Sequence, residues 1–179
     1  MKVRRQLAAL EPMVLGPMHG VTGDVWHRAP KSKWSLAQIV AHLALSVDLS
    51  SSVFERRAEK QDMIRRSTPG QSVLRHLYLG LGRYPAGRKA PESTQPSEHP
   101  DSDLMVAQFR MGVERFTTLL DTWPDKRQLE VFVQHPLLGD LNLPEWVRFH
   151  YVHCRHHARQ IRDRLRWLRR ETRDERRET

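Results

Sequence analysis

Two histidines, His153 and His157, have the spacing in this sequence that most directly indicates chemistry. They lie four residues apart in a segment whose apolar residues recur every three or four positions, as on one face of a helix. Two imidazoles at this spacing lie one above the other, with Cβ atoms about 5–6 Å apart, and can bind one cation. Both fall on the apolar stripe of the segment. Spacing alone fits a shared metal ion and, equally, two core histidines that are hydrogen-bonded to neighbours.

A metal site with two histidines needs at least a third ligand, and His42 is a candidate for it. His42 belongs to a second apolar stripe, formed by Ile39, His42, Ser46, Leu49 and Val53. Three imidazoles from two facing helices would leave coordination positions open for water or substrate, which distinguishes functional metal sites from closed structural ones. Imidazole ligands suit zinc, nickel, iron or copper. His150 and His156 compete for the same role, because both lie near His153 on the same segment.

Four helical regions must position these histidines. The first falls within residues 2–26, where Pro12, Gly16 and Pro17 disfavour an unbroken helix. The second begins at a capping box of Ser35 and Gln38 and is expected to run to about residue 60. The third is expected from about Asp103 to Trp123, and the fourth begins near the capping pattern of Asn142 and Glu145.

The connections between these helices predict the topology. About 40 residues join the second helix to the third, which is enough to travel the ~37 Å length of a 25-residue helix. The two flanking helices can therefore be parallel. We predict an all-α protein, a four-helix bundle in up-down-down-up order with a long crossover between helices 2 and 3. Residues 71–80 are expected to add a short helix, and residues 129–135 an extended segment followed by a turn at 136–139. The crossover contains the prolines Pro69, Pro85, Pro91, Pro96 and Pro100.

The net charge of +9 invites a nucleic-acid function, but its distribution argues against one. Residues 155–179 hold ten arginines and five acidic residues, and the two signs alternate toward the end. This pattern favours a solvated helix end over a phosphate-binding arm. We predict one bundle domain at residues 1–168 and a charged, frayed tail at residues 169–179. A nucleic-acid-associated protein that uses this arginine-rich end remains an alternative.

The sequence also favours a cytoplasmic protein. Cys154 is the only cysteine, so an internal disulfide is impossible and a reducing compartment is the default. The apolar stretch near the start is interrupted by Glu11 and Pro12, and we therefore expect no export signal. No apolar run approaches the roughly 20 residues of a membrane span, so we expect no membrane association.

Two segments resemble motifs of the DinB/YfiT-like superfamily of helical-bundle metalloproteins. Residues 34–43, WSLAQIVAHL, resemble its W-[ST]-x-x-[EQ]-[IVL]-x-x-H-[LI] segment, and residues 135–146 resemble its HP-x-x-G-x-L-[TS]-x-x-EW lead into the last helix. Residues 153–161, HCRHHARQI, resemble its H-x-x-HH-x-x-QI ending. The motifs cover about 35 residues in the expected order. Asn142 departs from the usual threonine, but still supplies a cap.

The resemblance implies an up-down-down-up bundle and a divalent metal, such as zinc, nickel or iron, bound by His42, His153 and His157. His150 and Gln160 share the histidine stripe and could support a ligand from behind. Some superfamily members are thiol-dependent transferases and isomerases, and members often form dimers. The resemblance therefore implies a small-molecule substrate, including a low-molecular-weight thiol, and a homodimer as one option.

The functional hypothesis is a metal-dependent transferase, such as an S-transferase, or a hydrolase. The alternative without catalysis is a metal-binding protein. We assign no catalytic residue. Asp48 lies about 240° around the helix from His42, and Cys154 lies about 100° from His153, so neither is expected to face the site.

Overall fold

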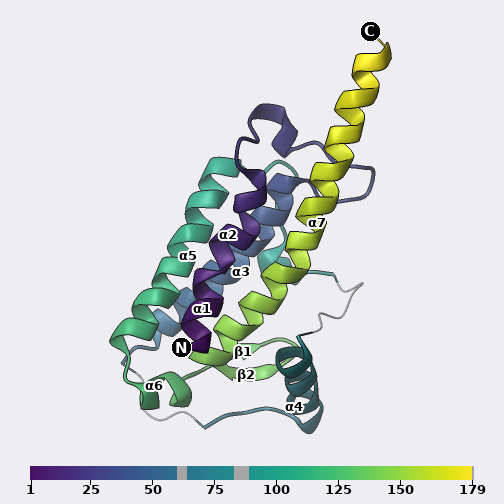
Figure 1. The fold of residues 1–179 in the computed structure, drawn as a ribbon. Coiled ribbons are helices and arrows are strands. Elements are labelled where there is room, and N and C mark those ends of the chain that lie inside the picture. Colours follow the sequence, from purple (N-terminus) through teal and green to yellow (C-terminus); the bar gives the residue numbers. More distant parts are fainter. Residues whose placement is uncertain (60–63, 83–88, 179) are drawn as a thin grey trace.

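The computed structural model describes residues 1–59, 64–82 and 89–178, and this part of the chain is mainly helical with one small sheet (Figure 1). The second predicted helix ends at Arg56, short of the expected residue 60. Pro85 and Thr179 lie outside the described residues. The elements in chain order are α1 (Lys2–Ala8), α2 (Leu10–Val14), η1 (Gly16–Met18), η2 (Gly23–Trp26), α3 (Leu36–Arg56), α4 (Pro69–Arg75), η3 (His76–Gly80), η4 (Glu92–Thr94), α5 (Ser102–Thr122), α6 (Asp125–Glu130), β1 (Phe132–His135), β2 (Gly139–Asn142) and α7 (Leu143–Glu178).

The predicted helix starts are confirmed by their caps. Ser35 accepts a hydrogen bond from the Gln38 amide while the Gln38 side chain accepts from the Ser35 amide, so the capping box of α3 is complete. Asn142 and Glu145 make the same reciprocal pair at the start of α7. Capping therefore sets where the two histidine-bearing helices begin.

The first predicted helix is divided. α1 and α2 meet at Ala9, where Pro12 removes the amide that would bond to the carbonyl of Ala8. The chain still turns tightly, because the amide of Met13 donates to the carbonyl of Ala9. The result is a bent helical segment rather than one continuous helix.

The long helices run side by side, and the site lies between two of them. In Figure 1, α1, α2 and α7 rise from the lower end, whereas α3 and α5 descend. α3 packs along α5, and both α1 and α2 pack on α7. The core between them is fully buried and includes Leu10, Leu36, Ile39, Leu43, Phe109, Phe116 and Ile161.

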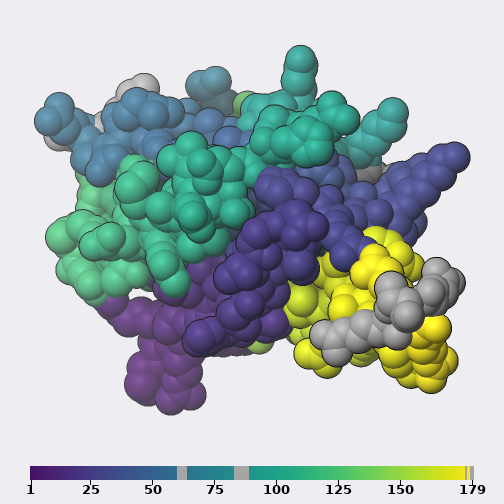
Figure 2. Space-filling view, turned by 90° about the horizontal axis from the view of Figure 1, so that it is seen from above, coloured from purple at the N-terminus to yellow at the C-terminus, as the bar shows by residue number. Residues whose placement is uncertain are grey.

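The end of α7 extends past the other helices (Figure 1). Seen from above, this yellow end lies beside the dark blue N-terminal segment (Figure 2). Arg28 donates to Glu175 at 2.6 Å across this contact. Residues 169–178 thus continue α7 as helix.

The segment before α7 differs from the expectation. Leu129 and Glu130 belong to the short helix α6, which the sequence reading missed, so the extended strand begins only at Phe132. β1 pairs antiparallel with β2, and His135 lies opposite Gly139. Gly139 has a φ of +72°, a backbone conformation that favours glycine. The indole of Trp146 donates to the carbonyl of Val133 at 3.0 Å and ties the hairpin to α7.

Gly112 allows a close approach of α5 to α3. A Cβ at this position would lie 2.9 Å from Cγ1 of Val47 and 3.1 Å from the backbone nitrogen of Asp48. Even the smallest side chain would therefore force α3 and α5 apart.

Among the described helices, α3 alone passes a length and hydropathy test for a membrane span. By length and composition only, this helix could cross a membrane. However, 61% of its most apolar window is buried inside the protein, as in the core helix of a globular fold.

Candidate metal centre

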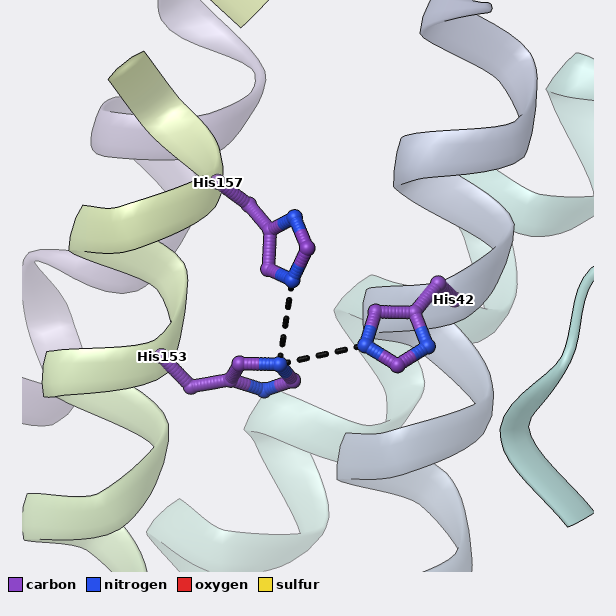
Figure 3. Close-up of side chains that lie close together, drawn as sticks. All are labelled: His42, His153 and His157. Atoms are coloured by element: carbon purple, nitrogen blue, oxygen red, sulfur yellow. Dashed lines mark hydrogen bonds between the residues drawn. The ribbon is translucent and has the colours of Figure 1, made fainter. Parts of the chain in front are cut away.

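Three buried histidines meet between α3 and α7 (Figure 3). His42 comes from α3, and His153 and His157 come from successive turns of α7. The Nε2 atom of His153 lies 3.1 Å from the Nε2 atom of His42 and 3.1 Å from that of His157. All three candidate ligand atoms lie within 4.8 Å of one another, and the side chains are 5% exposed or less. Side chains 111 positions apart in sequence thus converge on one point.

Hydrogen bonds behind two of the rings set their tautomers. Nδ1 of His42 lies 2.7 Å from the carbonyl oxygen of Thr94, which can only accept, so this nitrogen carries the proton. Nδ1 of His157 donates in the same way to Oε1 of Gln160 at 2.8 Å. A neutral imidazole that is protonated on Nδ1 keeps its lone pair on Nε2. Two lone pairs therefore face Nε2 of His153.

This donor set fits a divalent transition metal. One N–H on His153 cannot point at both lone pairs at once, whereas a central cation would accept all three. Ligand nitrogens around a tetrahedral zinc lie about 3.3 Å apart, close to the 3.1 Å of the two pairs here. Acceptors behind metal-binding imidazoles, as at His42 and His157, are the usual support of such ligands. The three histidines could hold a metal ion.

Burial keeps the three rings neutral. It lowers the pKa of His157 to about 3 and that of His153 well below the ordinary 6.5, with like charge among the neighbouring histidines acting in the same direction. The pKa of His42 is also lowered by burial, against the hydrogen bond to Thr94, which raises it. Neutral imidazole is the form that binds metals, so few protons compete at pH 7.

Two cavities meet at His42. One, of about 550 Å³, has His42 and His153 on its wall and is otherwise lined mainly by apolar side chains, including Leu49, Val53, Leu137, Trp146 and Phe149. The other, of about 580 Å³, is lined by His157 and by the polar side chains of Lys33, Lys89, Gln95, Gln160 and Arg164. In the described part of the chain, neither cavity is lined by a carboxylate.

Comparison with known proteins places the chain in a family. Residues 25–164 match the model of a family described as "protein of unknown function (DUF1569)". The chain belongs to the DUF1569 family. The match includes all three histidines and both cavities, whereas α1, α2 and the end of α7 lie outside it. Searches of curated proteins and of solved structures gave no match.

In this DUF1569 protein, the other predicted residues have different surroundings. Gln160 bonds to His157, as described above, and its amide nitrogen lies 3.2 Å from Nε2 of His156. His150 is fully buried and bonds through Nε2 to the Ser50 hydroxyl at 2.8 Å, among aromatic rings. Among the described residues, the side-chain hydrogen bond of His150 is thus to Ser50 and not to one of the three histidines.

The two residues that the sequence placed away from the site do lie elsewhere. Asp48 accepts from Arg115 and Gln108 of α5, at 2.6 and 3.0 Å. Cys154 is fully buried, and burial raises the pKa of its thiol, so it is no ready nucleophile.

Sequence reasoning missed three contributors to the site. Thr94 acts through its backbone carbonyl, which no side-chain pattern reveals. Lys89 reaches both cavities from the crossover, where the chain has no periodicity to place it. His135 lines the apolar cavity. Its position in the His-Pro motif was a signal, although it was used only for the family resemblance.

Proposed function

We propose that this DUF1569 protein is a metal-dependent enzyme of the DinB/YfiT-like type, a transferase or hydrolase that acts on a small molecule. The supporting observation is the convergence of three neutral Nε2 atoms, from His42, His153 and His157, where His42 and His153 line a cavity of about 550 Å³. Functional metal sites have such open faces. A four-helix bundle with a long crossover accounts for the parallel course of α3 and α5 in Figure 1.

A divalent transition metal in this position would lower the pKa of a thiol or water and so supply a nucleophile at neutral pH. Different residues of the chain would then have different roles. Thr94 and Gln160 hold the rings of His42 and His157. The polar cavity, with Lys33, Lys89 and Arg164, suits a hydrophilic thiol, and the apolar cavity suits its electrophilic partner.

We favour a transferase that uses a low-molecular-weight thiol over a hydrolase. Zinc hydrolases of the helical HExxH type use a carboxylate as general base, and neither cavity has one among the described residues. A thiol deprotonated by a metal needs no such base. In line with the single buried cysteine, we place the reaction in the cytoplasm.

The direct test is conjugation by the purified protein. Cysteine, glutathione and coenzyme A should each be tested with 1-chloro-2,4-dinitrobenzene, with hydrolysis of p-nitrophenyl acetate measured in parallel. We expect conjugation with at least one thiol that disappears on chelation and returns with zinc, nickel or iron. A full complement of metal with neither activity would support a non-catalytic metal-binding protein. Steeply salt-dependent DNA binding would instead support the nucleic-acid alternative.

The role of Gln160 gives a second test. Replacing Gln160 by leucine removes the acceptor behind His157 and should weaken metal binding about 10–100-fold. Gln160→Glu keeps an acceptor oxygen and should restore affinity. The dissociation constant can be measured by competition with a chelator of known affinity. Equal metal affinity in the wild type and the leucine variant would show that Gln160 only packs beside His157 and does not support metal binding.

A further inference from the structure

His135 is held in one tautomer by its own turn. The backbone amides of Leu137 and Leu138 both donate to Nδ1 of His135, at 3.1 and 3.2 Å. A nitrogen that accepts two hydrogen bonds carries no proton, so the proton of the neutral ring lies on Nε2. Burial lowers the pKa of His135 to about 4, and the ring therefore stays neutral at pH 7. The result is a fixed N–H donor.

Within the part of the chain that the structure describes, this donor is unused. The side chain is 9% exposed, and within residues 1–59, 64–82 and 89–178 its Nε2 atom has no hydrogen-bond partner. This Nε2 atom is not fully enclosed by other protein atoms, so a molecule outside the packed core can reach it. His135 lines the apolar cavity, so an apolar ligand that fills the cavity either accepts from this donor or leaves it desolvated without a partner, which is costly.

The donor shares this cavity with the histidine triad. The ring of Phe149 lies 4.5 Å from the His135 ring and 5.3 Å from the His153 ring, measured between centroids. One aromatic side chain therefore separates the two imidazoles along the cavity wall. A ligand that lies on Phe149 can reach toward both. The surrounding apolar residues, Leu49, Val53, Val133 and Leu137, match a ligand with a hydrocarbon or aromatic body.

We propose that His135 is a specificity residue that donates from Nε2 to a carbonyl-type oxygen of an apolar, uncharged small molecule in this cavity. The inference rests on the proposed function in that this molecule would be the electrophilic substrate. The binding of such a molecule can be measured without any turnover. In this role His135 recognises an acceptor and positions the molecule beside the triad.

Two ligands of nearly equal shape test the donor. Benzophenone carries a carbonyl oxygen where 1,1-diphenylethylene carries a methylene group, and both have an apolar body. Equilibrium dialysis gives the ratio of their dissociation constants for chelated and zinc-loaded protein. One neutral hydrogen bond contributes about 1 kcal/mol, so loss of the donor should reduce the preference for benzophenone about fivefold. Photocrosslinking by benzophenone, followed by peptide mass spectrometry, locates the bound molecule.

Two matched variants separate the effect of the Nε2–H donor on ligand preference from the effect of the Nδ1 acceptor on the turn. His135→Asn keeps an acceptor near the position of Nδ1 but lacks the distant N–H, so it should keep the turn and lose the preference. His135→Gln can carry an N–H near the position of Nε2 but loses the turn acceptor, so it should keep the preference at reduced thermal stability. An equal preference in the wild type and His135→Asn, or crosslinks outside the cavity, would overturn the inference. Absence of bound metal would refute the proposed function without affecting this ratio.

Discussion

Replacing His153 by alanine is expected to reduce the metal content of the purified protein from one ion per chain to background. The Nε2 atom of His153 lies 3.1 Å from the other two Nε2 atoms, so it is the ligand common to both pairs. The remaining two imidazoles lack the third ligand that protein zinc sites have. Metal content can be measured by inductively coupled plasma mass spectrometry after gel filtration.

His76→Ala is the matched control, because it removes an exposed histidine of η3 that lines neither cavity. It should retain the metal. Because His153 is buried, His153→Gln and His157→Ala should be measured beside it, with circular dichroism to confirm folding. A folded His153→Ala protein with a full complement of metal would refute the proposed site.

Acid is expected to unfold the metal-free protein well before its carboxylates are protonated. Burial lowers the pKa of His150 to about 3 and that of His135 to about 4, so the unfolded chain binds more protons than the folded chain below pH 6.5. Stability is therefore complete above pH 6.5 and falls as the pH decreases through this window. At pH 4.5 the loss from His150 alone should be about 3 kcal/mol, since each pKa unit corresponds to about 1.4 kcal/mol. Urea unfolding at pH 7 and pH 4.5 measures this loss in the free energy of unfolding.

His150→Leu isolates this contribution. The ring lies among Trp146, Phe149 and Phe116, where leucine fits, and Ser50 keeps its hydrogen bond to the carbonyl of Ser46 at 2.9 Å. The variant should be about as stable as the wild type at pH 7 and lose less stability at pH 4.5. The same loss in both proteins would mean that His150 is protonated in the folded state.

The helices that carry the triad were predictable because their signals are local. Capping boxes at Ser35 and Asn142 are set by residues three positions apart, and helical periodicity places His42, His153 and His157 on inward faces. The packing of α3 against α7 had no local signal, because it depends on residues far apart in the sequence. Periodicity showed that both faces were apolar, and only the family resemblance selected His42 as the partner of the α7 pair.

The elements missed from the sequence lack such signals. α6 has six residues, too few to show a helical period, and Leu129 and Glu130 were assigned to the following strand. The bend at Ala9 was anticipated only as a region of uncertainty, because proline is tolerated in the first turn of a helix and breaks a helix interior, and nothing local marks Leu10 as a new helix start. The acceptor behind His42 comes from η4, in a crossover whose path is set by tertiary contacts.

Gly112 has no side chain, and this affects how precisely His42 is positioned relative to His153 and His157. Val47 and Asp48, which a Cβ there would strike, belong to the same rigid helix as His42. A displacement of α3 by a few tenths of an ångström would carry the His42 ring with it, while His153 and His157 would stay on α7. Such a shift is a large part of the roughly 0.5 Å within which the groups of a binding site must be held. The geometry of the three histidines is therefore governed in part from α5, by a residue that touches none of them.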